Sequence, residues 1–339
     1  MRLEATLNAS YPRSEDVAKL YSKFLSNKIS AEEFDRGIED ATLKLFRLLR
    51  SVNIKVFTDG MLRWDDIFNP LIRFIEGVEV NGLMRFYDNN FFFRAPTVKS
   101  KLRVRDDVPL INWFKKSVEL AKNVFGNDFM LKQVLPGPLT LATNSINKFY
   151  SSVESLIHDW RSEVLEPLIK YLSSTGGLRV VEIHEPSLTW RETNESLRRL
   201  SINELRNLIN YVKKVLGIDV WILTYFGSLR VVGDDISELA DAVIGIDYFT
   251  KDLGRVQLVI RDHGLRRVML GLIDSRNTRM EDPLRIRRSI SRVLDYGARE
   301  VFVGNNAPMD FIPEVIASKK IKRLGKIISK IKGEIHGMD

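Results

Sequence analysis

The sequence predicts an α/β fold, a single (β/α)8 TIM barrel with an inserted β-hairpin. Short apolar runs alternate with longer segments whose apolar residues recur with the 3.6-residue period of a helix. There are eight such runs, which is the strand count of this barrel. No GxGxxG or GxxxxGKS motif follows the first run, so the open nucleotide-binding sheets are disfavoured. The expected strands are Leu3–Asn8, Ile54–Thr58, Phe129–Leu135, Leu178–Ile183, Val220–Thr224, Ala242–Ile246, Val268–Ile273 and Glu300–Val303.

Capping residues and apolar stripes predict helices between these strands. Ser30 followed by Glu33 forms a capping box, which predicts a helix that ends before Asn53 and leads into the second strand. We expect the segment Asn203–Val215 to repeat this arrangement, with Gly217 as its C-terminal stop.

The whole chain, residues 1–339, is expected to form one domain, because no Pro/Gly/Ser-rich linker divides it. A further apolar run, Phe86–Phe93, falls between the second and third units and indicates a hairpin insertion at about residues 78–100. A basic amphipathic helix is expected at about residues 314–333, with its apolar stripe on the barrel. Its basic residues are expected to lie in water and are Lys319, Lys320, Lys322, Arg323, Lys326, Lys330 and Lys332.

The composition excludes several classes of protein. The chain has no cysteine, which removes disulfides, thiolate metal sites and cysteine nucleophiles. It has no 18-residue apolar run and no signal-peptide pattern, so a cytoplasmic protein without a membrane partner is expected. The net charge of +8 comes with no nucleic-acid motif, and no nucleic-acid partner is expected. Scarce glutamine and abundant charged residues suggest a thermophilic source.

Polar residues gather directly after the predicted strands, where the loops of a barrel converge on a ligand. The candidates for acid-base chemistry are His184, Asp247 and Asp59, although no catalytic role can be assigned to them from the sequence. A histidine here could bind an acidic group, carry a proton or donate to a backbone carbonyl. The candidates for substrate binding are Asn8, Ser10, Trp64, Asp65, Glu185, Thr224, Tyr225, Asp274, Arg276, Asn277 and Asn305.

Four motifs follow one another at the ends of predicted strands: LPGPLT at 135–140, IHEPSL at 183–188, LTYFG at 223–227 and GLIDSRN at 271–277. Together they resemble the cobalamin-independent methionine synthase family, which implies a barrel of the uroporphyrinogen decarboxylase/methionine synthase type. The segment NASYPRS resembles the family's first loop, IGSFPQT, and Ser10 takes the position of a serine that contacts homocysteine. Met61 stands where a glutamate would bind the ammonium group. His184 replaces an aspartate of the family's IDEPAL motif, and Glu185 is retained.

The resemblance also implies that this chain holds no zinc. The family's catalytic half binds zinc through two cysteines, a histidine and a glutamate, and those positions fall here on Thr224, Phe226, Asp247 and Ala307. These residues cannot supply the close N, S and O donors that zinc requires. The segments TYFG, YDNNFFFRAP at 87–96 and DSRN look instead like the family's zinc-free N-terminal barrel.

That barrel packs against the catalytic barrel and helps to hold the methyltetrahydrofolate tail. The resemblance therefore implies a methyltetrahydrofolate-like or related pterin donor, a separate zinc-bearing catalytic chain as partner, and a part in methyl transfer to homocysteine in methionine biosynthesis. The corresponding activity is that of a 5-methyltetrahydropteroyltriglutamate–homocysteine S-methyltransferase, and whether this chain is active alone stays open. Arginines suited to an acidic tail are Arg13, Arg63, Arg94 and Arg276, and each could equally form a routine surface ion pair.

Three alternatives remain. The chain could be a self-sufficient methyltransferase with another acceptor or a corrinoid donor, using His184, Asp59 and Asp247 as polar groups. It could be a decarboxylase of the uroporphyrinogen type, although NASYPRS lacks that family's arginine-rich loop. It could also be a purely structural partner.

Overall fold

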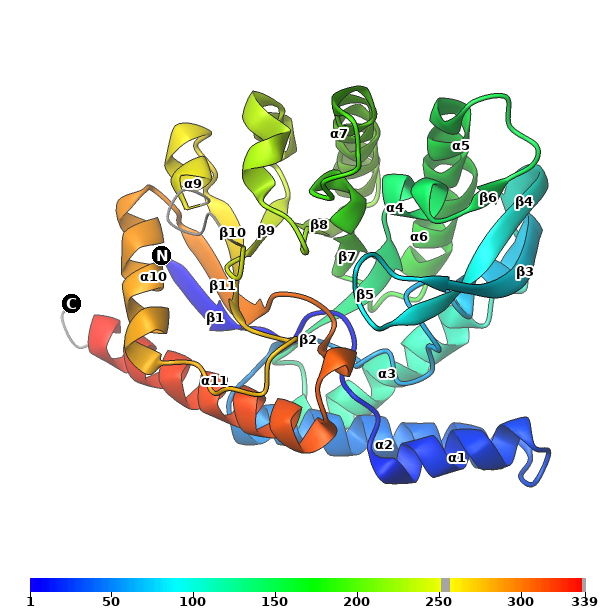
Figure 1. Ribbon diagram of the computed structural model, residues 1–339. Coiled ribbons are helices and arrows are strands. Elements are labelled where there is room, and N and C mark those ends of the chain that lie inside the picture. Colours follow the sequence, from blue (N-terminus) through cyan, green and yellow to red (C-terminus); the bar gives the residue numbers. More distant parts are fainter. Residues whose placement is uncertain (251–256, 337–339) are drawn as a thin grey trace.

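Eight parallel strands form a nearly closed barrel in the computed structural model, which describes residues 1–250 and 257–336 (Figure 1). The strand order is β1-β11-β10-β9-β8-β7-β5-β2, and a bridge between Thr6 and Val56 joins the first and last of these strands. The strands are β1 Arg2–Ala5, β2 Val56–Thr58, β5 Met130–Pro136, β7 Val180–His184, β8 Asp219–Leu223, β9 Val243–Asp247, β10 Arg267–Ile273 and β11 Glu300–Asn305. Each predicted strand overlaps one of them, so the predicted fold class is confirmed.

A long hairpin is inserted between β2 and β5, as predicted. Its strands are β3 Ile75–Arg85 and β4 Phe92–Val104, and β6 Ile146–Asn147 adds a short third strand beside β4. The hairpin extends beyond the predicted bounds, and most of the run Phe86–Phe93 forms its turn. Polar residues between the phenylalanines favour a turn, and Tyr87 adopts a positive φ of 53° there.

Helices surround the barrel, and the capping box at Ser30 is confirmed. The Ser30 side chain accepts from Glu33 N at 3.2 Å, and the Glu33 side chain accepts from Ser30 N at 2.9 Å. The helices are α1 Glu15–Leu25, α2 Ala31–Ser51, α3 Leu110–Phe125, α4 Pro138–Thr143, α5 Val153–Asp159, α6 Glu166–Ser173, α7 Glu195–Asn210, α9 Leu258–Asp262, α10 Pro283–Asp295 and α11 Glu314–His336. Segments with 3-10 or π-helical geometry are η1 Leu71–Phe74, η2 Trp160–Leu165, η3 Pro186–Leu188, η4 Tyr211–Val215, η5 Leu229–Leu239 and η6 Met309–Phe311.

One predicted helix start is wrong. Helix α7 begins at Glu195, eight positions before Asn203, because the Asn194 side chain accepts from Leu197 N at 2.9 Å and caps it. Asn203 therefore lies inside the helix. Gly217 ends this helical stretch with a φ of 67°, as predicted.

The C-terminal helix α11 packs Ile321, Leu324 and Ile328 against the rest of the protein. Lys320 was expected in water, and that expectation is wrong. Its side chain is fully buried, forms an ion pair with Glu281 and donates to the Arg279 carbonyl at 2.7 Å. A lysine can enter a buried helix face when a partner carboxylate meets it there.

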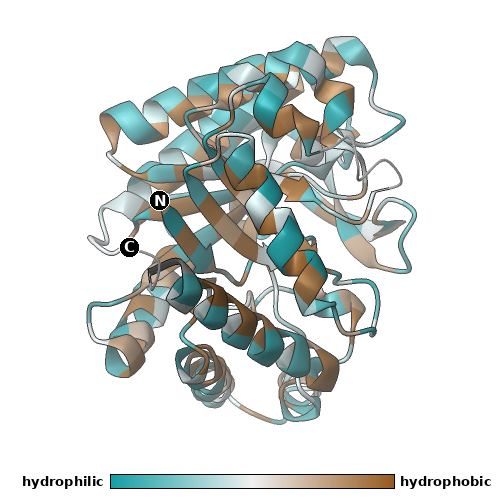
Figure 2. Cartoon of the chain, turned by 90° about the vertical axis from the view of Figure 1, so that its left-hand side faces the viewer, coloured by the Kyte–Doolittle hydropathy of each residue, from teal (hydrophilic) through white to brown (hydrophobic). Residues whose placement is uncertain are grey.

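Apolar side chains fill two layers. A large cluster lies between the sheet and the helices, and a smaller cluster around Trp221, Met269 and Phe302 is contributed by several barrel strands. In Figure 2 the strands are mostly brown, whereas the surrounding helices carry both teal and brown residues. In the described ranges, no helix is both long and apolar enough to cross a membrane.

Candidate functional site

A buried polar network lies inside the barrel. Lys132 on β5 pairs with Glu182 on β7, and both side chains are fully buried. The Lys132 ammonium also donates to Asn8 Oδ1 at 2.6 Å and to Thr6 Oγ1 at 3.0 Å. Because β1 is not a neighbour of β5 or β7 in the sheet, these contacts cross the barrel interior.

The network is closed to solvent, and its charged members shift one another's pKa values. Burial alone would raise the pKa of Glu182, but Lys132 and His184 lower it to about 2. Burial lowers the pKa of Lys132, and Glu182 opposes that shift. The Lys132 ammonium also lies 4.3 Å from the centre of the Trp221 ring, which adds a cation–π contact. The pair therefore fixes strand positions and is not poised to react with a ligand.

Stability is expected to depend on Glu182 at acid pH. Its pKa is about 2 in the folded protein and 4.5 ordinarily, so its contribution is fully present above pH 4.5 and is lost as the pH falls towards 2. The full contribution is about 3 kcal/mol. Glu182→Gln lacks the ionised partner at every pH. We expect its deficit in unfolding free energy, measured by denaturant titration against the parent protein, to shrink between pH 5 and pH 2; a constant deficit would contradict this assignment.

His184 belongs to this network. One ring nitrogen lies 2.7 Å from Glu182 Oε1 and the other lies 3.1 Å from the Tyr225 hydroxyl, and both residues are fully buried. Both nitrogens thus have internal partners. The geometry favours a structural histidine over a proton carrier in contact with a ligand.

Glu185 joins the LPGPLT and IHEPSL motifs. Its carboxylate accepts from Leu139 N at 3.1 Å, from Thr140 N at 2.6 Å and from the Thr140 hydroxyl. A Cβ at Gly137 would overlap this carboxylate, so glycine is required for the close approach. Burial raises the pKa of Glu185 to about 7, while the Thr140 and Leu139 donors favour its ionised form. The two motifs therefore form a clamp between the ends of β5 and β7.

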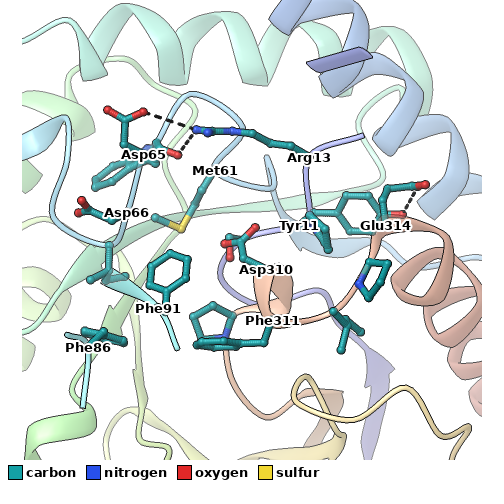
Figure 3. Close-up of a pocket in the computed structure, with 17 residues that line it drawn as sticks. Tyr11, Arg13, Met61, Asp65, Asp66, Phe86, Phe91, Asp310, Phe311 and Glu314 are labelled. Atoms are coloured by element: carbon teal, nitrogen blue, oxygen red, sulfur yellow. Dashed lines mark hydrogen bonds and ion pairs between the residues drawn. The ribbon is translucent and has the colours of Figure 1, made fainter. Parts of the chain in front are cut away.

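A pocket of about 300 Å³ opens among the loops that follow β1, β2 and β11. Its walls include Trp64, Phe86, Phe91 and Phe311, together with the Met61 thioether. Figure 3 shows the Asp310 carboxylate between Met61 and Phe91 on one side and Tyr11 on the other. The site has the size and mixed character of a small-molecule pocket.

Most charges in the pocket are already paired. Asp65 lies 3.9 Å from Arg13 and 3.8 Å from Arg94, and the Tyr11 hydroxyl donates to Glu314 Oε1 at 2.8 Å. Arg13 also stacks on Tyr21, 3.7 Å from the ring centre. The pocket is net acidic, since Asp65, Asp66, Asp310 and Glu314 line it with Arg13 as its one basic residue.

The structure brings three of the predicted substrate-binding residues to this pocket, Ser10, Trp64 and Asp65, together with Arg13, one of the arginines considered for an acidic tail. Beneath them, Asn8 N donates to Asn305 Oδ1 at 2.9 Å and Asn305 Nδ2 donates to Asn8 O at 2.8 Å, which ties β1 to β11.

The remaining predicted residues lie elsewhere. Asp59 is half-buried and accepts from Ser117 Oγ at 3.0 Å, and burial raises its pKa. On the loop after β10, Asn277 is exposed and Asp274 caps the backbone of Arg276. Arg276 lies 5.2 Å from the centre of the Phe226 ring.

Comparison with known sequences identifies the family. The profile of the cobalamin-independent synthase N-terminal domain matches residues 57–296, more than half of the chain. The chain belongs to the cobalamin-independent methionine synthase family. The matching region is the N-terminal domain, as the resemblance implied.

Relatives in this family match over nearly the whole chain. The methionine synthase of Sulfolobus acidocaldarius is 25% identical over 336 residues, covering 98% of this chain and 91% of its own length. That of Thermococcus kodakarensis is 23% identical, with 98% and 94% covered. A B12-independent methionine synthase from Shewanella sp. W3-18-1, solved with selenomethionine, has a TM-score of 0.79 at 18% identity, covering 99% of this chain and all of that one. This last likeness shows the shared fold.

Thr224 and Asp247, which the resemblance places at two of the family's zinc positions, have other hydrogen-bond partners in this structure. Asp247 Oδ1 accepts from Asn306 Nδ2 and from Phe249 N, both at 2.9 Å, and its other oxygen accepts from Phe226 N at 3.2 Å. The Thr224 hydroxyl donates to the Gly245 carbonyl at 3.1 Å. Burial raises the pKa of Asp247, and the Asn306 amide opposes this shift.

These residues do not fit zinc. They offer one carboxylate, whose oxygens already accept three hydrogen bonds, and neither a thiolate nor an imidazole. Among residues 1–250 and 257–336, no group of three or more His, Cys, Asp or Glu side chains is arranged to hold a metal ion.

Several pocket residues were missed by the sequence reasoning. Asp310 and Phe311 follow the last strand, and Phe86 and Phe91 come from the hairpin turn. The aromatic-rich turn was a visible signal. Lys132 and Glu182 were also missed, although a charged residue within an otherwise apolar strand, as in MLKQVLP and VVEIH, marks a buried pair.

Proposed function

We propose that this chain is the zinc-free component of a two-chain methionine synthase. It binds a methyltetrahydrofolate-like donor and assists methyl transfer to homocysteine by a separate, zinc-bearing catalytic chain. The same proposal treats residues 1–339 as one domain.

The observation that carries this proposal is the hydrogen bonding of Asp247, which the resemblance places at one of the family's zinc positions. Asp247 is committed to Asn306 and to two backbone amides, so nothing at that point would activate a thiol. A pocket with aromatic walls is nevertheless present at the carboxyl ends of the strands, where barrels bind ligands. The pocket and the hydrogen-bonded Asp247 carboxylate together support a role in donor binding without thiol activation.

In this role the chain's own residues bind and orient. The aromatic walls exclude water from a bound donor ring, and Ser10 and Asp310 offer polar contacts at its edge. The partner chain supplies the zinc-bound thiolate.

The test combines the purified chain with a zinc-bearing methionine synthase chain from the same organism. We expect a stable complex in size-exclusion chromatography and at least about a tenfold rise in methyl transfer from methyltetrahydrofolate to homocysteine, equivalent to about 1.4 kcal/mol of barrier. Phe91→Ala is expected to reduce the rise, because it removes a pocket wall, whereas the exposed Lys214→Ala is expected to leave it unchanged. An unchanged rate with the partner would overturn the proposal. Methyl transfer by this chain alone would favour a self-sufficient methyltransferase instead.

A further inference from the structure

We infer that a groove outside the candidate pocket binds a ligand whose ammonium and carboxylate groups are separated by an aliphatic chain, as in an ω-amino acid or the C-terminal lysine of a polypeptide. The groove lies between α2 and α11, beside the start of α1, and has a volume of about 560 Å³. Figure 1 shows these three helices along the lower side of the barrel. Tyr11, Pro12 and Glu314 line both the groove and the pocket, so they form the wall between the two. The groove is therefore a second site, and its ligand does not depend on the proposed function.

Helix packing gives the groove two distinct ends. A Cβ at Gly325 of α11 would overlap Val52, so the two helices touch where α2 ends. From this contact the groove extends towards the N-terminal ends of both helices. At its other end α1 packs beside α2, where a Cβ at Gly37 would overlap the Leu20 side chain. The position of a residue in α2 or α11 therefore tells to which end of the groove it belongs.

The floor of the groove is aliphatic. Val17, Leu45 and Leu62 are buried, which holds them in place, while Leu20 and Leu48 are half-buried and leave part of their surface open. Covering aliphatic surface with another aliphatic chain removes both from water. The volume lies within the usual range for small-molecule sites. The floor therefore suits the methylene chain of an elongated ligand.

Charges of opposite sign lie towards the two ends. Asp16 and Asp40 lie on the side of α1, and Lys44 and Lys322 lie nearer the contact between α2 and α11. Asp40 and Lys44 are one helical turn apart, a rise of about 6 Å, and side chains at this spacing commonly pair. Within the part of the chain that the structure describes, none of these four side chains forms a hydrogen bond or an ion pair. All four charges are thus left for a ligand.

A ligand that satisfies both ends carries both charges. Its ammonium group lies beside Asp16 and Asp40, and its carboxylate lies beside Lys44 and Lys322. A free α-amino acid fits poorly, because its ammonium group adjoins its carboxylate and meets the lysines as a like charge. A C-terminal lysine has its α-nitrogen in a peptide bond and avoids this repulsion. Since the four side chains are exposed, salt screens them and the affinity falls as ionic strength rises.

The experiment titrates the purified full chain with small probes at low ionic strength, followed by ligand-observed NMR. 6-Aminohexanoate carries both charges on an aliphatic chain, whereas hexanoate and hexylamine carry one each. We expect 6-aminohexanoate to bind at least about threefold more tightly than either, because it gains one more ion pair. Nα-acetyl-lysine distinguishes the two sources of this chemistry. Binding equal to that of 6-aminohexanoate supports a polypeptide C-terminus, and weaker binding supports a free ω-amino acid.

Two variants assign the ends of the groove. Asp40→Asn is expected to reduce the advantage of 6-aminohexanoate over hexanoate, because the ammonium group loses a partner. Lys44→Met combined with Lys322→Met is expected to reduce its advantage over hexylamine, because the carboxylate loses its partners. Asp16 is kept, since an acidic side chain in the first turn of α1 also stabilises that helix.

The matched controls are Asp234→Asn and Lys214→Met, two exposed charges outside the groove, which should leave every affinity unchanged. Thermal melting verifies that all variants are folded. Failure of 6-aminohexanoate to bind overturns the inference, and equal binding of 6-aminohexanoate, hexanoate and hexylamine removes the pairing of charges. Unchanged selectivity in both groove variants places binding elsewhere on the chain. None of these outcomes depends on whether the chain stimulates a zinc-bearing partner, so the proposed function stands or falls separately.

Discussion

Lys132→Met is expected to lower the free energy of unfolding by about 3 to 5 kcal/mol, since it leaves the Glu182 carboxylate buried without its counter-charge. Methionine has a similar length, so the loss does not come from a cavity. Glu182 would keep His184 and the Ala9 amide, which donates to it at 2.7 Å, but neither carries the ammonium charge. The expected result is a protein that still folds, with a much lower denaturation midpoint.

Guanidinium unfolding of the parent protein and three variants checks this expectation. The exposed Lys214→Met serves as the matched control and should change stability by less than about 0.5 kcal/mol. The double variant Lys132→Met with Glu182→Gln should recover part of the loss, because no full charge then remains buried at the pair. A Lys132→Met protein as stable as the control would show that the pair contributes nothing to the fold.

Glu185→Ala is expected to cost about 3 kcal/mol of stability. Three buried donors, Leu139 N, Thr140 N and the Thr140 hydroxyl, lose their common acceptor, and an unsatisfied buried donor typically costs about 1 to 3 kcal/mol. Gly137→Ala should also destabilise the protein, because its new methyl group would displace the same carboxylate.

The measurement separates this clamp from a role in ligand binding. Thermal and denaturant unfolding should reveal the loss in Glu185→Ala, while Glu192→Ala, an exposed neighbour on the same loop, should match the parent protein. At a temperature where the variant is folded, its affinity for 5-methyltetrahydrofolate should be the same as that of the parent protein. Normal stability with abolished binding would instead place Glu185 in the ligand site.

The sequence predicted the barrel well because strand burial has a direct chemical signature. The buried parallel strands are short, largely apolar runs, and all eight were recognisable. Helix starts were less certain, since Asn194 and Asn203 are equally good caps by residue type and only the tertiary packing selects Asn194. Lys320 shows the same limit: its burial depends on Glu281, a residue 39 positions away in sequence.

The sequence predicted where the candidate site lies, but not which side chains line it. Polar residues after strands were expected to gather at one pole, and three of them, Ser10, Trp64 and Asp65, share a pocket. The sequence could not distinguish side chains that face the pocket from those that hold the loops, as Glu185 and Asp247 do, because hydrogen-bond partners are assigned by the fold. The sequence also could not show that the hairpin turn supplies Phe86 and Phe91 to the pocket, because this depends on how far the hairpin reaches over the barrel.

The pocket joins the two ends of the chain. Its walls come from residues 10–13 and 61–67, from the hairpin turn and from residues 308–314. The pocket is therefore complete only when β11 is paired with β1. A small molecule bound there would stabilise the pairing of β1 with β11, and so would favour the closed barrel over one that opens between these two strands.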